Sequence, residues 1–214
     1  MKNIKQIIRN SGAYNILLLP IRERIQEKSW FTGCRLGPAP HSVKYRNIMA
    51  LADAFGATAF IETGTFRGDM VAKVLHRFDP IFSIEVFPPL AQAARHRFAR
   101  DTNVSILEGD SSTFLSTAIA AARGRIIFWL DGHYSGPGTG RSTGDSPICQ
   151  EMEIIFLARV SQGFHDIVLI DDARLFDGTD GYPELAAFMD SIRDRWSYYV
   201  SSSDDCIFVL PQGA

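Results

Sequence analysis

Three aspartates are the residues of this sequence whose type and spacing point most clearly to chemistry. Asp131 ends the apolar run that starts at Ile126, and Asp171, followed by Asp172, ends the run that starts at Ile167. If the two runs are neighbouring strands, the three carboxylates converge and repel one another unless a cation neutralises them. Hard oxygen ligands suit Mg²⁺, Mn²⁺ or Ca²⁺ better than zinc. We therefore predict a divalent-metal site at Asp131, Asp171 and Asp172, and the alternative for the Asp-Asp pair is helix capping or a turn.

A histidine lies close to this expected site. His133 comes two residues after Asp131, near enough to reach a substrate hydroxyl held on the cation. An imidazole titrates near neutral pH and can accept that proton as a general base. The alternative is a histidine that is exposed or hydrogen-bonded for structural reasons. We predict His133 and Asp131 as the catalytic residues, and we expect the loop from Gly132 to Ser146 to close over the site.

A glycine-containing turn, Glu62-Thr63-Gly64-Thr65-Phe66-Arg67-Gly68, follows the first predicted strand. Small residues there let a ligand approach the backbone and the N-terminus of the next helix. The pattern is E-x-G-x-x-x-G, which differs from the G-x-G-x-x-G of dinucleotide-binding proteins. The acid favours a cationic or hydroxyl-bearing ligand, and a plain strand-to-helix turn is the alternative. The candidate cofactor-binding residues of this turn are Glu62, Gly64 and Gly68.

Acidic residues also follow the next two predicted strands. Glu85 lies about twenty residues beyond the glycines, where nucleotide-binding sheets place an acid on the ribose hydroxyls. Its structural alternative is a salt bridge from Arg95 or Arg97. Asp110 and Ser111 follow the third strand at the same edge, near the expected place of an adenine. The alternative in that turn is a helix N-cap by one of its serines, and the two roles are compatible.

The elements that must position these residues alternate along the chain. Short β-branched or aromatic runs alternate with longer segments of helical periodicity, which predicts βαβ units around a parallel sheet. The last two strands are separated only by residues 202–206, so we expect them to pair antiparallel. The predicted fold is α/β, a Rossmann-like doubly wound seven-stranded sheet, mostly parallel with an antiparallel C-terminal strand. Its strands are Ala59–Glu62, Ile81–Val86, Val104–Leu107, Ile126–Asp131, Ile167–Asp171, Tyr198–Ser201 and Ile207–Leu210.

Residues 1–56 precede this alternation and include a predicted helix from Ser42 to Phe55. We interpret residues 1–56 as a helical N-terminal extension or cap over the mouth of the site, and residues 57–214 as the domain that carries it. Five further helices are expected within that domain. They are Gly68–Arg77, Leu90–Arg100, Thr113–Ala122, Pro147–Arg159 and Pro183–Asp194.

Composition limits the partners and the compartment. The 214 residues carry 22 Lys and Arg against 24 Asp and Glu, a net charge of −2 that creates no strong field for nucleic acid. The longest apolar runs fall short of a membrane span, and no secretory signal is recognisable. Three cysteines without C-x-x-C spacing fit a reducing compartment. We expect a cytoplasmic protein with a small-molecule acceptor, no nucleic-acid or membrane partner, and homodimerisation as an open option.

Taken in order, these segments resemble the class I S-adenosylmethionine-dependent methyltransferases, especially the metal-dependent catechol and macrocin O-methyltransferase groups. The resemblance spans about residues 60–210. It implies that residues 57–214 form a class I methyltransferase domain, in which the E-x-G-x-x-x-G turn holds the methionine end of S-adenosylmethionine. It also implies that Glu85 binds the ribose, that Asp110 and Ser111 contact the adenine, and that the three aspartates ligate Mg²⁺.

The chain departs from both groups at the position of the base. Catechol O-methyltransferase has a lysine base three positions after its strand-four aspartate, where this chain has Tyr134. The macrocin group has an aspartate two positions after its metal aspartate, where this chain has His133. The proton-accepting role therefore carries over only with a changed residue.

The resemblance implies a metal-dependent methyltransferase of class EC 2.1.1, acting on a hydroxyl of a sugar, a polyketide or a catechol-like diol. Two other functions remain open. A metal-dependent glycosyl- or nucleotidyltransferase is one, because Asp-Asp pairs also hold metal-bound pyrophosphates. A non-catalytic cofactor-binding protein with the same fold is the other.

Overall fold

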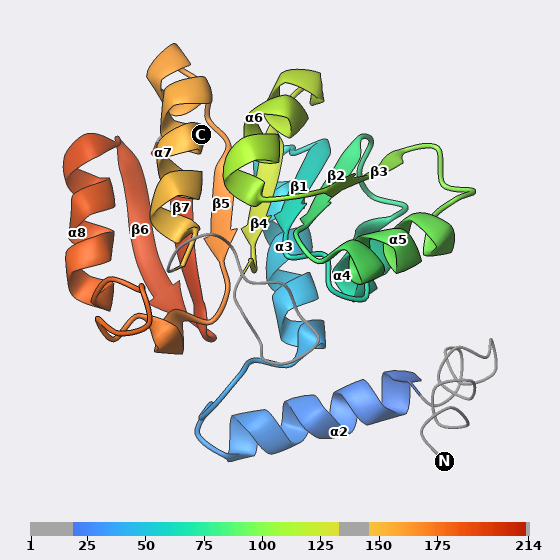
Figure 1. The fold of residues 1–214 in the computed structure, drawn as a ribbon. Helices are drawn as coiled ribbons and strands as arrows, with labels where there is room; N and C mark the ends of the chain where they lie inside the picture. The colour runs from blue at the N-terminus through green and yellow to red at the C-terminus, as the bar shows by residue number, and fades with distance from the viewer. Residues whose placement is uncertain (1–18, 133–145, 213–214) are drawn as a thin grey trace.

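The computed structural model describes residues 19–132 and 146–212, in which seven strands form one sheet of order β3-β2-β1-β4-β5-β7-β6 (Figure 1). Strands β1 to β5 run parallel, and β7 pairs antiparallel with β5 and with β6. The predicted α/β sheet with an antiparallel C-terminal pair is therefore confirmed. The strands are β1 Ala59–Thr63, β2 Ile81–Glu85, β3 Val104–Glu108, β4 Ile126–Leu130, β5 Ile167–Ile170, β6 Tyr198–Ser203 and β7 Cys206–Pro211.

Helices cover both faces of the sheet. One face packs against α6 (Ser111–Ala121), α7 (Ile148–Ala158) and α8 (Leu185–Arg195). The other packs against α3 (His41–Phe55), α4 (Asp69–Val74) and α5 (Pro88–Arg97). Two short 3-10 helices, η2 (Val160–Gln162) and η3 (Ala173–Leu175), flank β5 along the chain. The sheet is thus doubly wound, as predicted.

The central strands are buried on both faces, which explains why their sequences are continuous apolar runs. In β4 every residue is buried. Phe128 and Leu130 join the core under α6, α7 and α8, whereas Ile127 and Trp129 join the core under α3, α4 and α5. These two cores hold the carboxyl ends of the parallel strands at one edge of the sheet.

The N-terminal region contributes directly to this architecture. Ile48 and Ala52 of α3 are fully buried in the same core as Trp129. The helix α2 (Leu19–Thr32), which we did not predict, lies beside α3 and outside the two layers (Figure 1). The division of the chain at residue 56 and the role of a cap remain predictions.

Among the described residues, no helix combines the length and the apolar character that a membrane span requires.

Candidate functional site

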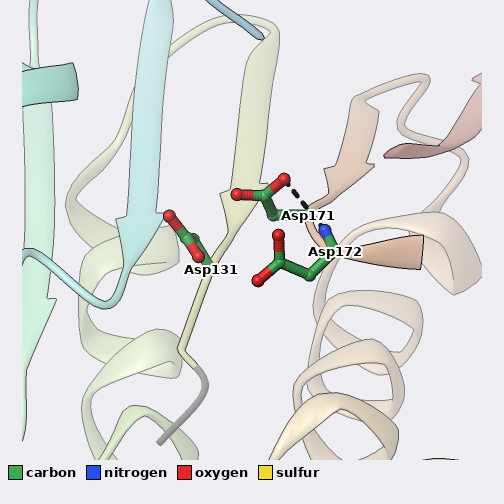
Figure 2. A group of neighbouring side chains, drawn as sticks. All are labelled: Asp131, Asp171 and Asp172. Atoms are coloured by element: carbon green, nitrogen blue, oxygen red, sulfur yellow. Dashed lines mark hydrogen bonds between the residues drawn. The ribbon is translucent and has the colours of Figure 1, made fainter. Parts of the chain in front are cut away.

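The three predicted aspartates converge at the carboxyl edge of the sheet. Asp131 follows β4 and Asp171 and Asp172 follow β5, and one carboxylate oxygen of each lies within 4.8 Å of the others (Figure 2). The cause is the parallel pairing of β4 with β5, which brings the ends of both strands together. Asp171 and Asp172 are buried and Asp131 is half-buried. The strands end one residue earlier than predicted, although the amides of Asp131 and Asp171 still bond to the neighbouring strands.

A buried lysine, which we did not predict, lies among these carboxylates. Lys44 of α3 donates from Nζ to Asp171 Oδ2, and its Nζ is 3.7 Å from Asp172 Oδ1. Lys44 shares the buried side of α3 with Ile48 and Ala52, one and two turns along. A lysine on the apolar face of the predicted helix 42–55 was the available signal, because a buried charge requires a partner.

The surroundings of Lys44 keep it charged. Burial by itself lowers the pKa of Lys44, but the negative charges of Asp171, Asp131 and Asp172 outweigh it and raise the pKa above its ordinary value. The ammonium also lies 5.9 Å from the ring centroid of Trp129, within the range of a cation–π contact.

Protein donors already occupy the two aspartates that follow β5. Asp171 Oδ1 accepts from the amide of Asp172 at 2.9 Å and from Sγ of Cys206 at 3.9 Å. Asp172 Oδ1 accepts from Nη1 of Arg174 at 2.6 Å. Three carboxylates have the right chemistry for a hard divalent ion, but a metal shared by Asp171 and Asp172 would take the place of Lys44. As arranged here, the residues do not fit the predicted metal, whose presence stays untested.

The predicted general base, His133, lies outside the described residues, as does most of the Gly132–Ser146 loop. Its role remains a prediction.

Glu62 lies inside the protein at the end of β1. It accepts from Ser83 Oγ at 2.5 Å, and Ser83 is in turn 2.6 Å from Thr65 Oγ1. Burial, with the charges of Asp131 and Glu85, raises the pKa of Glu62 well above its ordinary value, against the lowering effect of Ser83. Its role in cofactor binding remains a prediction.

Glu85 binds the backbone of two turns. Its carboxylate accepts from the amide of Phe66 at 2.7 Å and from the amide of Phe87 at 2.9 Å. Burial raises the pKa of Glu85, and these amides act in the opposite direction. The alternative of a salt bridge from Arg95 or Arg97 is wrong, because these pair with Glu108 and Asp69.

The two glycines of the predicted turn are needed for packing within the protein. Gly64 has φ +83°, and a Cβ there would lie 2.3 Å from the carbonyl oxygen of Asp131. Gly68 has φ +71°, and its Cβ would lie 2.6 Å from the ring of Phe98. Gly64 thereby lets the ends of β1 and β4 approach each other.

Asp110 caps helix α6. Its side chain accepts from the amide of Ser112 at 2.8 Å and from the hydroxyl of Ser112 at 2.6 Å. Our alternative of a serine N-cap is therefore wrong in its residue, because the helix begins at Ser111 and the capping position before it is Asp110. Ser111 is the first residue of α6. Contacts of Asp110 and Ser111 with an adenine remain predictions.

Two buried polar atoms near Gly132, Thr63 Oγ1 and Glu151 Oε1, make no well-formed hydrogen bond within the described residues, although the Glu151 carboxyl lies close enough to the side chains of Ser111 and Thr63 for them to lower its pKa. A Cβ on Gly132 would lie 3.3 Å from the first and 3.4 Å from the second, so both face the same point. Glu151 also lines a cleft with Asp131, Asp171 and Tyr182. Unsatisfied buried polar atoms are rare, and at this edge they fit the polar groups of a bound cofactor or acceptor.

The buried carboxyl of Glu151 should make the stability of the fold depend on pH. Burial raises the pKa of Glu151 from 4.5 to about 7, so between these values the folded state binds more protons than the unfolded state. This contribution to stability is complete below pH 4.5 and is lost as the pH rises through 7, by about 3 kcal/mol at most.

Urea unfolding of the wild type and of Glu151→Gln at acidic and mildly alkaline pH measures this contribution. We expect the glutamine variant to gain stability relative to the wild type as the pH rises. An equal pH dependence in both proteins would contradict the raised pKa.

Comparisons with known proteins support the architecture. No protein-family model matches the sequence, and no curated protein matches it. Solved structures do match. The O-methyltransferase TomG from Streptomyces achromogenes, involved in tomaymycin synthesis, has a TM-score of 0.59 at 13% identity, over 88% of this chain and 89% of TomG. A Staphylococcus aureus protein assigned as a caffeoyl-CoA O-methyltransferase has a TM-score of 0.59 at 12% identity, over 98% of both chains.

The matches also include a nucleic-acid enzyme. The 23S rRNA methyltransferase ErmE has a TM-score of 0.50 at 13% identity, over 83% of this chain and 70% of that chain. At these identities the likeness concerns the fold and leaves the acceptor undecided. The matches with the two O-methyltransferase structures cover most of this chain, which therefore has the Rossmann-like fold of class I methyltransferases.

Proposed function

We propose that the protein is an S-adenosylmethionine-dependent methyltransferase that methylates a hydroxyl oxygen of a small molecule. The observation that carries this proposal is the carboxyl edge of the sheet, where the buried polar side chains of Thr63 and Glu151 face the same point beside Asp131 without a well-formed hydrogen bond from the described residues. In an open α/β sheet, ligands bind outside the carboxyl ends of the strands. The class I methyltransferase fold favours this cofactor over others.

The cofactor would contribute an electrophilic methyl group on a sulfonium. Glu85 would bind its ribose, because each carboxylate oxygen uses one backbone amide and keeps further acceptor capacity. Asp110 and Ser111 would face the adenine. The acids Glu85 and Asp131 favour a ligand that carries positive charge.

The acceptor would bind at the surface beside Asp131, where the cleft itself has a volume of only about 10 Å³ and would take no more than the reacting group. Burial raises the pKa of Tyr182 to about 12, so its phenol stays protonated and can donate a hydrogen bond to an acceptor oxygen. His133 would accept the proton of the hydroxyl group. The acidic character of this edge supports a small molecule over RNA, because carboxylates repel a phosphate backbone.

Calorimetric titration with S-adenosylmethionine, S-adenosylhomocysteine and nucleotide sugars tests the proposal. We expect saturable binding of the first two, followed by methyl transfer to a hydroxyl-bearing acceptor. Preference for a nucleotide sugar would favour the glycosyl- or nucleotidyltransferase, and cofactor binding without turnover over a broad acceptor panel would favour the non-catalytic protein. No binding of either S-adenosyl compound contradicts the proposal.

Replacing Glu85 by alanine should weaken binding of S-adenosylhomocysteine by about 1–3 kcal/mol, the range for hydrogen bonds to a charged group. Glu108→Ala is the matched control, because Glu108 pairs with Glu85 in register on β3 and its side chain binds Arg95. The control should bind like the wild type, and both variants should be checked for folding by thermal unfolding. Wild-type affinity in Glu85→Ala would remove the ribose role.

A further inference from the structure

We propose that Lys44 is the built-in cation of the carboxylate cluster and holds the place that a divalent metal would otherwise take. The proposal rests on the described residues around Asp171 and holds whether or not the protein transfers methyl groups.

The position of the ammonium is the first argument. Nζ of Lys44 is hydrogen-bonded to Asp171 and lies 3.7 Å from Asp172, the two carboxylates that a shared metal would also need. The three residues are 7%, 4% and 3% exposed, so little water reaches their charges to solvate and screen them. A buried carboxylate pair of this kind needs a cation, and the chain provides one.

The second argument is that two elements, α3 and β4, fix the position of the Lys44 ammonium. The helix α3 is anchored by Ile48 and Ala52 in the core, which fixes the base of the lysine side chain. The indole of Trp129 on β4 lies 5.9 Å from the ammonium and presents an aromatic ring to it. A surface lysine that happened to reach a metal site would lack this support.

The third argument is the occupancy of the ligand atoms. Asp171 Oδ1 is bonded to the amide of Asp172, and Asp172 Oδ1 is bonded to Arg174. A divalent ion on these carboxylates would have to displace the ammonium of Lys44. It would also lie beside a second cation, the guanidinium of Arg174. In this cluster, which also includes Asp131, the ammonium of Lys44 orders the carboxylates in place of an exchangeable metal ion. We expect catalysis by such a site to need no added Mg²⁺ and to survive a chelator.

Binding of Mn²⁺, followed by electron paramagnetic resonance of the free ion, tests the proposal without a substrate. The wild type should show no saturable site at millimolar Mn²⁺. Lys44→Met keeps an unbranched side chain one atom shorter and removes the charge, so it should gain a site for one Mn²⁺ and a higher unfolding temperature with the ion. Lys73→Met is the control, because Lys73 pairs with Glu23 of α2 and its loss should create no site.

The outcomes distinguish a cluster occupied by the Lys44 ammonium from one occupied by a divalent metal. A saturable Mn²⁺ site in the wild type that Asp171→Asn abolishes would overturn the proposal. So would a folded Lys44→Met variant that binds no Mn²⁺, because the carboxylates would then not form a cation site at all.

A second measurement covers the case in which Lys44→Met fails to fold. In the wild type with isotope-labelled lysine, nuclear magnetic resonance should show one ammonium group protected from exchange, and Lys44→Arg should remove this signal. Saturating Mg²⁺ should leave the signal unchanged. Absence of a protected ammonium, or its displacement by Mg²⁺, would overturn the proposal.

Discussion

Replacing Arg159 by methionine is expected to lower the free energy of unfolding by about 3–5 kcal/mol, the usual cost of leaving one member of a buried ion pair alone. Arg159 binds Asp166 through two hydrogen bonds of 2.6 Å and 3.1 Å, and also binds the carbonyl of Gly124 at 2.9 Å. Asp166 additionally accepts from the amide of Ile126 at 2.8 Å. The pair therefore ties the end of α7 to the starts of β4 and β5, at the edge opposite the candidate site.

Urea unfolding of the single and double variants measures this effect. Arg159→Met combined with Asp166→Leu should recover part of the loss, because neither charge then remains buried without its partner. Arg195→Met, which breaks an exposed pair with Glu153, is the control and should change stability little. If Arg159→Met costs no more than this control, the buried pair does not stabilise the fold.

Replacing Gly64 by alanine is the second large effect that we expect, a loss of about 2–5 kcal/mol from backbone strain and overpacking together. The new Cβ would lie 2.3 Å from the carbonyl oxygen of Asp131, and backbone atoms cannot rotate away as a side chain would. Asp131 or the end of β1 must then move. We therefore expect binding of S-adenosylhomocysteine to weaken along with the stability.

Gly178 offers a matched control for this substitution. It has the same φ of +83°, but no heavy atom lies within 4 Å of a Cβ placed there. Gly178→Ala thus measures the cost of the backbone conformation alone, about 1–2 kcal/mol. Equal losses in the two variants would show that the contact with Asp131 is unimportant.

Most of the sheet was predictable because the central strands are buried on both faces and their sequences are therefore continuously apolar. The runs Ile126–Leu130 and Ile167–Ile170 are apolar at every position, as strands covered on both faces require. Convergence of the three aspartates followed from the same reasoning, since neighbouring parallel strands end at one edge. Helix α2 was missed because it shows little amphipathic pattern and buries only Trp30 among its residues.

The parts of the site that were missed depend on contacts distant in the sequence. Lys44 and Asp171 are separated by 127 positions, and a lysine on an apolar helix face does not reveal its partner. The neighbour of Gly64 is likewise a distant carbonyl, that of Asp131 just after β4. At the start of α6 the difficulty is local, because Asp110 and the two serines after it are all good capping residues.

The contact between Lys44 and Trp129 also gives this region of the protein an optical signal. Trp129 is fully buried, and the ammonium near its ring is a fixed charge that perturbs the energy of the excited indole. Any event that moves Lys44 away from the carboxylates should therefore change the emission spectrum of Trp129. Intrinsic fluorescence of a variant that lacks Trp30 and Trp196 can follow the state of the cluster in solution, with no label attached to the chain.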